Sequence, residues 1–120
     1  MAEHNDLGKK GEEEAVRLLQ SIGHTVLEQN WKLFGYEIDI ISEHEEFIVF
    51  TEVKTRSGMK WGNPEDAVGK GRMKRLIVAA DIYLRSKGIN KPARFDIVAV
   101  VWNGVQFDCE HFEDAFMAFM

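Results

Sequence analysis

The sequence predicts an α/β domain in which helices lie against a mixed β-sheet. A helical pattern opens the chain, three strand-like segments follow, and a second helical pattern separates these from two further strands. Because parallel neighbours need a long crossover, the second helix makes the strands on its two sides a parallel pair. The expected order is αβββαββ with a short C-terminal helix, in a single domain over residues 1–120, a length that can bury an ordinary core.

The first helix is expected to begin at Asn5 or Asp6, either of which can cap it, and to end at Gly23. Its apolar residues recur at helical spacing: Leu7, Ala15, Leu18, Leu19 and Ile22. Three strands follow, over residues 25–31, 37–41 and 46–55. The segment between the last two is short and polar, so these strands are expected to form a hairpin.

The second helix is expected after a glycine-containing loop over residues 56–63, with Asn63 as its N-cap and Pro64 as its first residue. Glycines interrupt its opening turns, and an apolar stripe then continues to Gly88. This helix supplies the crossover between the third and fourth strands.

The C-terminal part is expected to add two strands and a short helix. Residues 95–101 are nearly all apolar, which is typical of a strand covered on both faces. Asn103 and Gly104 favour a tight turn into a last strand over 105–109. The Phe-rich tail, residues 111–120, is predicted to form a short helix that contacts the body of the domain or a second copy.

The composition predicts a soluble, cytoplasmic protein that does not enter a membrane. The N-terminal segment is too charged for a signal peptide, and the apolar runs are shorter than the roughly 20 residues that cross a bilayer. Cys109 is the only cysteine, so an internal disulfide is excluded. The four histidines lie too far apart in the sequence to indicate a zinc site.

The charge distribution leaves the kind of partner open. The net charge is -5, from 15 basic and 20 acidic residues, whereas nucleic-acid-binding proteins are usually basic. Basic residues nevertheless gather between Lys54 and Arg75, where seven of them stand against two acids. Taken alone, this run fits a solvated face as well as a phosphate-binding one.

Acidic residues are expected to meet where the two strands of the hairpin pair. If the hairpin closes around Glu45 and Glu46, position 39 lies opposite 52, and 37 opposite 54. Like charges in that relation destabilise a sheet, so Asp39 beside Glu52 requires a reason. A bound Mg²⁺ ion supplies one, because it prefers oxygen ligands and keeps several waters.

Two further side chains extend this candidate site. Lys54 lies one pleat beyond Glu52 on the same face, from where it can orient a metal-bound water or stabilise charge on a phosphate. Glu12 lies at the edge of the apolar arc of the first helix and can lean toward the sheet, whereas Glu13 is expected to face water.

An alternative explains the same residues without chemistry. Glu52 or Glu37 paired with Lys54 would form ion pairs on a wet face, and the strand pattern alone slightly favours this interpretation. Asp96, at the start of a buried strand, is expected to bond backbone groups rather than a metal ion.

The wider sequence resembles a known family. An acid on one strand and E-x-K at the end of the next resemble the PD-(D/E)xK nuclease superfamily, which has a restriction-endonuclease-like core. Five strings, which follow one another over nearly the whole chain, are similar to the bacterial YraN-like family: GKKGEEEA, YEIDII, VFTEVKTR, AVGKGRMKRLIVAADIYL and RFDIVAV. That family is an uncharacterised group of predicted nucleases similar to Holliday junction resolvases.

The resemblance implies roles for particular residues. Asp39 and Glu52 would be the metal ligands, with Mg²⁺ as the ion and Mn²⁺ as a substitute. Lys54 would be the active-site lysine, and Glu12 would be a further acidic residue of the site.

The residues and the resemblance together predict a Mg²⁺-dependent nuclease that cleaves DNA, with a structure-specific, resolvase-like substrate. Four basic side chains are expected to contact phosphates: Arg56, Lys60, Lys70 and Lys74. The alternatives are a nucleic-acid-binding module without catalysis and a protein-interaction domain that uses the Phe-rich tail. Because a resolvase needs two active sites for two strands, a homodimer is a further hypothesis.

Overall fold

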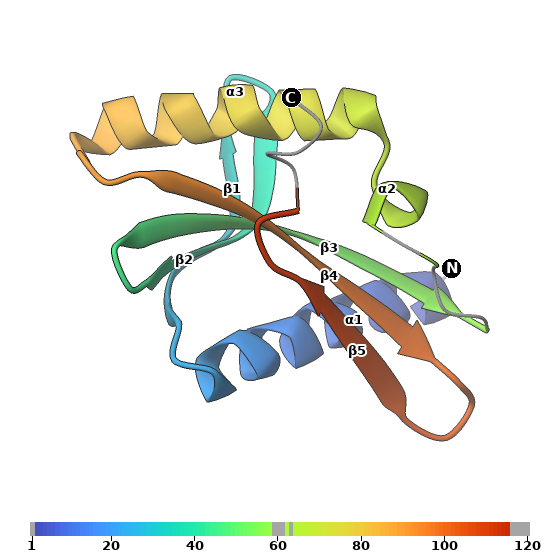
Figure 1. Cartoon of the computed structure of the whole chain (residues 1–120). Coiled ribbons are helices and arrows are strands. Elements are labelled where there is room, and N and C mark those ends of the chain that lie inside the picture. The colour runs from blue at the N-terminus through green and yellow to red at the C-terminus, as the bar shows by residue number, and fades with distance from the viewer. Residues whose placement is uncertain (1, 59–61, 63, 116–120) are drawn as a thin grey trace.

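The computed structural model describes residues 2–58, 62 and 64–115. Five strands form one sheet in the order β1-β2-β3-β4-β5, and helices lie on both of its faces (Figure 1). The elements are α1 (Ala2–Ser21), β1 (Thr25–Leu33), β2 (Tyr36–His44), β3 (Phe47–Ser57), α2 (Pro64–Ala67), α3 (Lys70–Lys87), β4 (Ala93–Trp102) and β5 (Phe107–Phe112). The predicted α/β class with a mixed sheet is confirmed.

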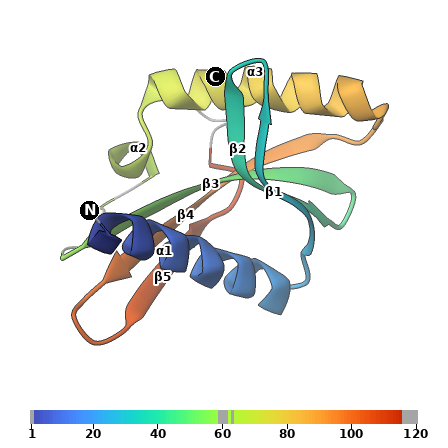
Figure 2. The ribbon, with the colours of Figure 1, turned by 180° about the vertical axis from the view of Figure 1, so that it is seen from behind.

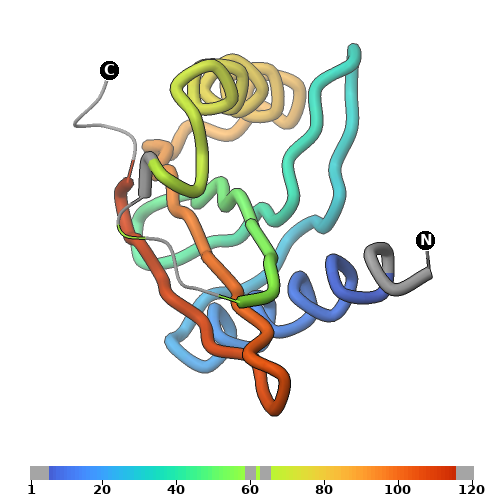
Figure 3. The backbone as a smooth tube through the Cα atoms, turned by 90° about the vertical axis from the view of Figure 1, so that its right-hand side faces the viewer, coloured from blue at the N-terminus to red at the C-terminus, as the bar shows by residue number. Residues whose placement is uncertain are grey.

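The connection through α2 and α3 makes β3 and β4 parallel, as the sequence predicts, whereas the other neighbouring strands are antiparallel. Seen from behind and from the side, α3 covers one face of the sheet and α1 crosses the other (Figures 2 and 3). The sheet therefore has a separate apolar core on each face. Within the described part of the chain, none of the helices combines the length and the apolar character that a membrane span requires.

The two cores use alternate residues of the central strands. On the α3 side, the fully buried ring of Phe50 stacks on Phe95, with ring centroids 5.7 Å apart. On the α1 side, the buried residues are Ala15, Leu19, Ile40, Val98 and Val100. Because successive side chains of a strand point to opposite faces, strands that are apolar throughout can serve both cores.

The hairpin between β2 and β3 has the predicted register. It closes at His44 opposite Phe47, around Glu45 and Glu46, and the regular pairing continues to Ile40 opposite Thr51. The next residues in this register are Asp39 and Glu52, so the two acids stand at the point where the regular pairing ends.

The second helical region consists of two helices, whereas the sequence predicts one. Its opening is divided into α2 and α3, and Gly69 is the N-cap of α3. Gly88 ends α3 in the left-handed conformation with φ 66°, which supports the predicted helix end. The predicted N-cap, Asn63, lies outside the described residues.

The last strand begins later than predicted. The side chain of Asn103 accepts hydrogen bonds from the backbone N–H groups of Val105 and Gln106, so the connection is a loop over 103–106 rather than a two-residue turn. β5 consequently extends through His111 and Phe112, where the sequence predicts the start of a helix. The remaining tail, residues 116–120, lies outside the described part of the chain.

Candidate functional site

The site begins at a bend that β1 and β2 share. Their pairing includes Gln29 opposite Ile40 and Trp31 opposite Ile38, but it passes over Asn30 and Asp39 between them. Asn30 has a left-handed backbone with φ 51°. Ile38 belongs to the α3-side core and Ile40 to the α1-side core, although residues two apart in a regular strand share a face. The strand therefore twists at Asp39.

The twist directs the carboxylate of Asp39 to the backbone of β3. Its Oδ2 accepts a hydrogen bond from the N–H of Val53 at 2.9 Å. A side chain thus satisfies a backbone donor just beyond the end of the regular pairing. This contact brings Asp39 next to Glu52, as the hairpin register predicts.

Glu52 is buried, with 5% of its surface exposed, and its charge is compensated by a residue of α3. Arg72 donates from Nε to Oε2 at 3.0 Å and from Nη2 to Oε1 at 3.1 Å. The same Nη2 lies 2.9 Å from the carbonyl oxygen of Glu37. Arg72 therefore connects α3 with both β2 and β3 at the candidate site.

Asp39 is outside the ion pair of Glu52 and Arg72, although its charge also acts on Arg72, and its pKa is raised to about 7. Burial is the main cause, followed by the negative charge of Glu52, while the hydrogen bond from Val53 lowers the pKa and the charge of Glu12 raises it further. The pKa of Glu12 is also raised, chiefly by burial, against a hydrogen bond with Asn30 that lowers it. Glu12 thus belongs to the same group of interacting acids, as the sequence predicts.

The basic residues predicted for the site differ in their position and exposure. Lys54 is half-buried and follows Glu52 by two residues on β3. The ion-pair partner of Glu52 is Arg72. The alternative prediction of an ion pair between Glu52 and Lys54 is therefore wrong. Arg56, Lys70 and Lys74 are exposed, the first at the end of β3 and the others in the opening turns of α3. Lys60 lies outside the described residues.

The donor set of the site fits a hard cation in part. Among residues 2–58, 62 and 64–115, no group of three or more His, Cys, Asp or Glu side chains is arranged to hold a metal ion. Asp39 and Glu52 nevertheless supply adjacent carboxylates, and the raised pKa of Asp39 indicates negative charge that Arg72 does not fully compensate. A divalent ion would complete this compensation with two protein ligands and water, which is a common arrangement for Mg²⁺.

Two residues of the site are missed by the sequence-based prediction. Asn30 is polar in a strand segment, but nothing in a period-two pattern indicates a left-handed residue there. Arg72 stands in the basic run, four residues before Leu76 in the apolar stripe of the helix, and this spacing offers a signal that it faces the sheet.

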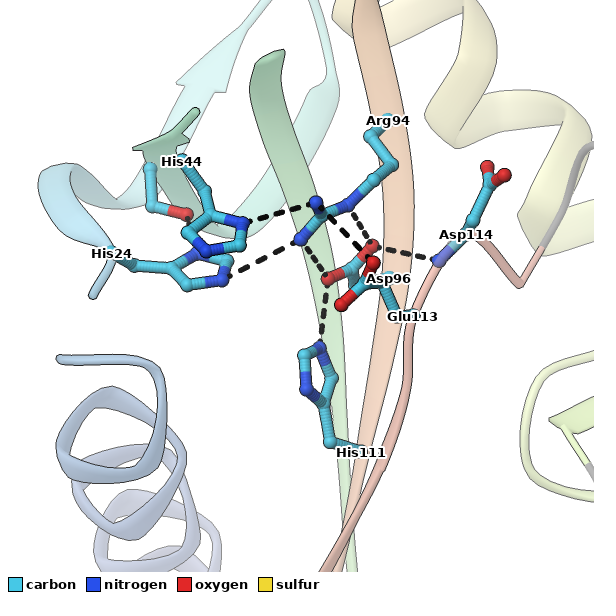
Figure 4. Close-up of polar contacts among 8 residues, drawn as sticks. His24, His44, Arg94, Asp96, His111, Glu113 and Asp114 are labelled. Atoms are coloured by element: carbon cyan, nitrogen blue, oxygen red, sulfur yellow. Dashed lines mark hydrogen bonds and ion pairs between the residues drawn. The ribbon is translucent and has the colours of Figure 1, made fainter. Parts of the chain in front are cut away.

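A second polar cluster lies at the other end of the β2–β3 hairpin, beside the chain that leaves α1 (Figure 4). The ring of His24 stacks on that of His44 with centroids 4.2 Å apart, and its Nδ1 lies 2.8 Å from Oγ of Ser42. Figure 4 shows the guanidinium of Arg94 between these rings and Asp96. Arg94 holds Asp96 through two nitrogens, at 3.0 and 2.9 Å.

Asp96 ties this cluster to β5. Its carboxylate lies 2.8 Å from Nε2 of His111 and accepts the N–H of Asp114 at 3.0 Å. Burial alone would raise the pKa of Asp96, but the hydrogen bonds from His111, Arg94 and Asp114 hold it below the ordinary value. The predicted bond to backbone is confirmed, and the two side-chain partners are additional. The cluster joins the segment between α1 and β1 to β2, β4 and β5 through polar contacts that are buried or partly buried.

Comparison with known proteins gives a consistent match. The model of a family described as "Uncharacterised protein family UPF0102" matches residues 11–100. A UPF0102 protein of Flavobacterium psychrophilum is 46% identical over 119 residues, which is 99% of this chain and 100% of the relative. A UPF0102 protein of Phocaeicola vulgatus is 43% identical over 116 residues, which is 97% of this chain and 96% of the relative.

Proposed function

Given that the chain belongs to the uncharacterised family UPF0102, the YraN-like family that its motifs resemble, we propose that it is a Mg²⁺-dependent nuclease that cleaves DNA in the cytoplasm. The proposal includes a restriction-endonuclease-like core. One observation carries it: the carboxylates of Asp39 and Glu52 meet where the hairpin pairing ends, and the pKa of Asp39 is raised to about 7. Uncompensated negative charge at this point favours a divalent ion.

When bound, the metal ion would polarise a phosphate oxygen and make its water more acidic. Asp39 and Glu52 are the proposed ligands. Lys54, one pleat beyond Glu52, orients the attacking water or stabilises negative charge on the phosphate. Glu12, held by Asn30, completes the acidic side of the site and can accept a proton from water.

The basic side chains near the site are proposed to hold the nucleic acid. Lys70 and Lys74 lie one turn apart on the same side of α3, and Arg56 follows Lys54 on β3. Contacts of this kind bind phosphates and carry no base information, so recognition of DNA structure is expected rather than of a base sequence. A homodimer would present two such sites to a branched substrate.

The decisive experiment measures cleavage of supercoiled plasmid and of a four-way DNA junction with Mg²⁺ or Mn²⁺. The Asp39→Asn and Lys54→Ala variants should lose cleavage while their thermal unfolding stays cooperative. The neighbouring acids of α1 provide a matched pair, because Glu12→Gln should lower the rate whereas the exposed Glu13→Gln should not. Equal cleavage by the wild type and all of these variants would remove the proposed site.

A second candidate function is a nucleic-acid-binding module without turnover. The ion pair between Arg72 and both oxygens of Glu52 favours it, because these oxygens are already engaged. This candidate predicts DNA binding that weakens steeply with salt and no cleavage with any divalent ion. Cleavage by an Arg72→Ala variant would show that the guanidinium inhibits the reaction, and would favour the nuclease over this second candidate.

A further inference from the structure

The tip of the β1–β2 hairpin carries an aromatic side chain that the domain leaves uncovered. Phe34 is 80% exposed and is the first of two residues between the paired Leu33 and Tyr36. A single exposed apolar side chain is common on protein surfaces. Whether Phe34 has a role therefore depends on its backbone conformation, on the contacts that hold the hairpin in place and on the charges nearby.

The backbone at the tip is unfavourable for phenylalanine. Phe34 has φ 53° and Gly35 has φ 80°, so both loop residues are left-handed. Two-residue hairpin loops of this kind favour Asn-Gly or Asp-Gly, because Asn and Asp tolerate the left-handed region better than a bulky residue does. Strained backbone conformations cluster at functional sites, so a strained aromatic residue at an exposed tip indicates a function.

α3 fixes the position of the hairpin. The guanidinium carbon of Arg75 lies 4.6 Å from the ring centroid of Tyr36, and its Nη2 donates to the carbonyl oxygen of Gly35 at 3.3 Å. Arg72 makes the corresponding contact with Glu37 while it holds Glu52. The side view shows the hairpin rising from the sheet beside α3 (Figure 3). The tip is therefore held at a defined place relative to the candidate site.

Basic side chains outnumber acidic ones next to the tip, where the exposed Glu37 stands opposite Lys32 in the β1–β2 pairing. Lys32 precedes Phe34 by two residues, and the opening turns of α3 present exposed Lys70, Lys74 and Arg75. The first turn of α3 contains no acidic residue, and a helix N-terminus itself favours negative charge. This arrangement of an exposed ring beside basic side chains matches the chemistry of a nucleic acid, which offers base faces next to phosphates.

We infer that Phe34 acts as a wedge that stacks against bases at a branch point or an unpaired position of DNA, while the basic residues of α3 hold the adjacent phosphates. The inference rests on the proposed function and names its substrate class, which is DNA with bases open to stacking. Continuous duplex offers such a ring a base face only after unstacking, which costs energy, so branched or partly single-stranded DNA binds better.

The test measures DNA binding in the presence of EDTA, which removes divalent ions and so separates binding from cleavage. Fluorescence anisotropy compares a four-way junction with a linear duplex of the same sequence, and 2-aminopurine next to the branch point reports stacking. The key variant is Phe34→Asn, because asparagine removes the ring and suits the left-handed backbone. We expect junction affinity to fall by about tenfold or more, the 2-aminopurine change to disappear, and the Tm to rise by roughly 2–5 °C.

The tip of the β4–β5 hairpin offers a matched control. Val105 lies in the β4–β5 loop and is 83% exposed, so Val105→Asn removes an apolar side chain of similar exposure without changing junction binding. Phe34→Trp should retain the preference for the junction. Unchanged discrimination in Phe34→Asn would overturn the wedge, as would sedimentation showing that this change dissociates a wild-type dimer held together by Phe34.

These results are independent of the cleavage assay. A protein that cleaves DNA but binds the junction and the duplex equally keeps the proposed nuclease function and loses the wedge. A protein that prefers the junction through Phe34 but does not cleave keeps the wedge and loses the nuclease.

Discussion

Arg72 holds both carboxylate oxygens of Glu52, with Nε 3.0 Å from Oε2 and Nη2 3.1 Å from Oε1. The side chain of Glu52 is 6% exposed and that of Arg72 is 29% exposed, so the pair is neither a surface ion pair nor a fully buried one. Its geometry is the bidentate form in which Arg binds carboxylates most strongly. The pair therefore contributes to stability as well as to the charge of the candidate site.

Replacing Arg72 by alanine should lower the free energy of unfolding by about 2 kcal/mol, because Glu52 would be left buried without its cation. The partial exposure of Arg72 keeps this figure below that of a fully buried pair. Urea unfolding measures the loss. The Arg72→Ala, Glu52→Ala double variant should lose less than the sum of the two single changes, and strict additivity would show that the pair carries no coupling energy.

The raised pKa of Asp39 predicts a pH-dependent stability. Between the ordinary pKa of 3.8 and the folded value of about 7, the folded state keeps a proton that the unfolded chain releases. Stability from this group is therefore present at low pH and is lost as the pH rises toward 7. Without divalent ions, Asp39→Asn should be more stable than the wild type at pH 8 by about 1–2 kcal/mol, with a smaller gain at pH 5.

Thermal unfolding at both pH values checks this prediction. The exposed Asp81 provides a control, because Asp81→Asn removes a carboxylate that is on the surface of α3 and paired with Arg85. A wild type that is more stable than Asp39→Asn at pH 8 would mean that the carboxylate at position 39 is compensated by charges other than those described above.

Local patterns are sufficient to predict the hairpin that brings the acids together. Glu45 and Glu46 lie in a short polar segment between alternating strands, which fixes the register and hence the approach of Asp39 to Glu52. The parallel pairing of β3 and β4 likewise follows from the length of the connection between them. These features depend on sequence neighbours or on chain connectivity alone.

The remaining features depend on tertiary contacts that no local period encodes. The bend at Asn30 and Asp39 appears in the sequence only as two polar residues in strands. Three histidines that look scattered in the sequence come together in the fold. The turn before β1, β2 and β5 place His24, His44 and His111 around one Arg–Asp pair. Side-chain capping by Asn103 similarly moves the start of β5.

The stacked histidines predict a loss of stability in acid. The pKa of His24 is lowered to about 4, mainly by burial and then by His44 and Arg94, with a further lowering by His111 and an opposing effect of Asp96. Between 6.5 and that value the unfolded chain binds a proton that the folded state does not, so stability falls as the pH decreases through this range.

A His24→Gln variant should show a smaller loss between pH 7 and pH 5 than the wild type, because its amide does not titrate. Urea unfolding at the two pH values measures the difference. NMR titration of the His24 ring gives an independent check, and a ring that takes up its proton near the ordinary value of 6.5 would contradict the prediction.

Phosphate contacts by α3 predict a change in the salt dependence of DNA binding. Lys70→Gln and Lys74→Gln should each reduce the slope of log K against log salt by about 1, whatever the DNA sequence. Lys87, at the far end of the same helix, provides the control. Anisotropy over a range of NaCl concentrations measures the slopes, and a slope that changes as much in Lys87→Gln would show that general charge, not position, governs binding.

α1 packs so closely on β3 that one glycine of α1 has no space for a Cβ atom, whereas another glycine of the same helix has. A Cβ atom at Gly11 would lie 2.0 Å from Oγ1 and 2.8 Å from Cγ2 of Thr55, whereas a Cβ at Gly8 would meet no atom within 4 Å. Gly8→Ala should stabilise the helix by up to about 1 kcal/mol. Gly11→Ala should instead destabilise the domain by about 1–3 kcal/mol, because the helix has to move away from the strand.

The same displacement should reach the candidate site, since Glu12 follows Gly11 directly. Gly11→Ala is therefore expected to lower DNA cleavage more than its stability loss explains, and Gly8→Ala to leave cleavage unchanged. Adding Thr55→Ala removes Oγ1 and Cγ2 but keeps the Cβ of residue 55, which lies 2.9 Å from the new Cβ, so the Gly11→Ala, Thr55→Ala double variant should recover both properties only in part. Recovery of stability without cleavage would separate the packing of α1 from the placement of Glu12.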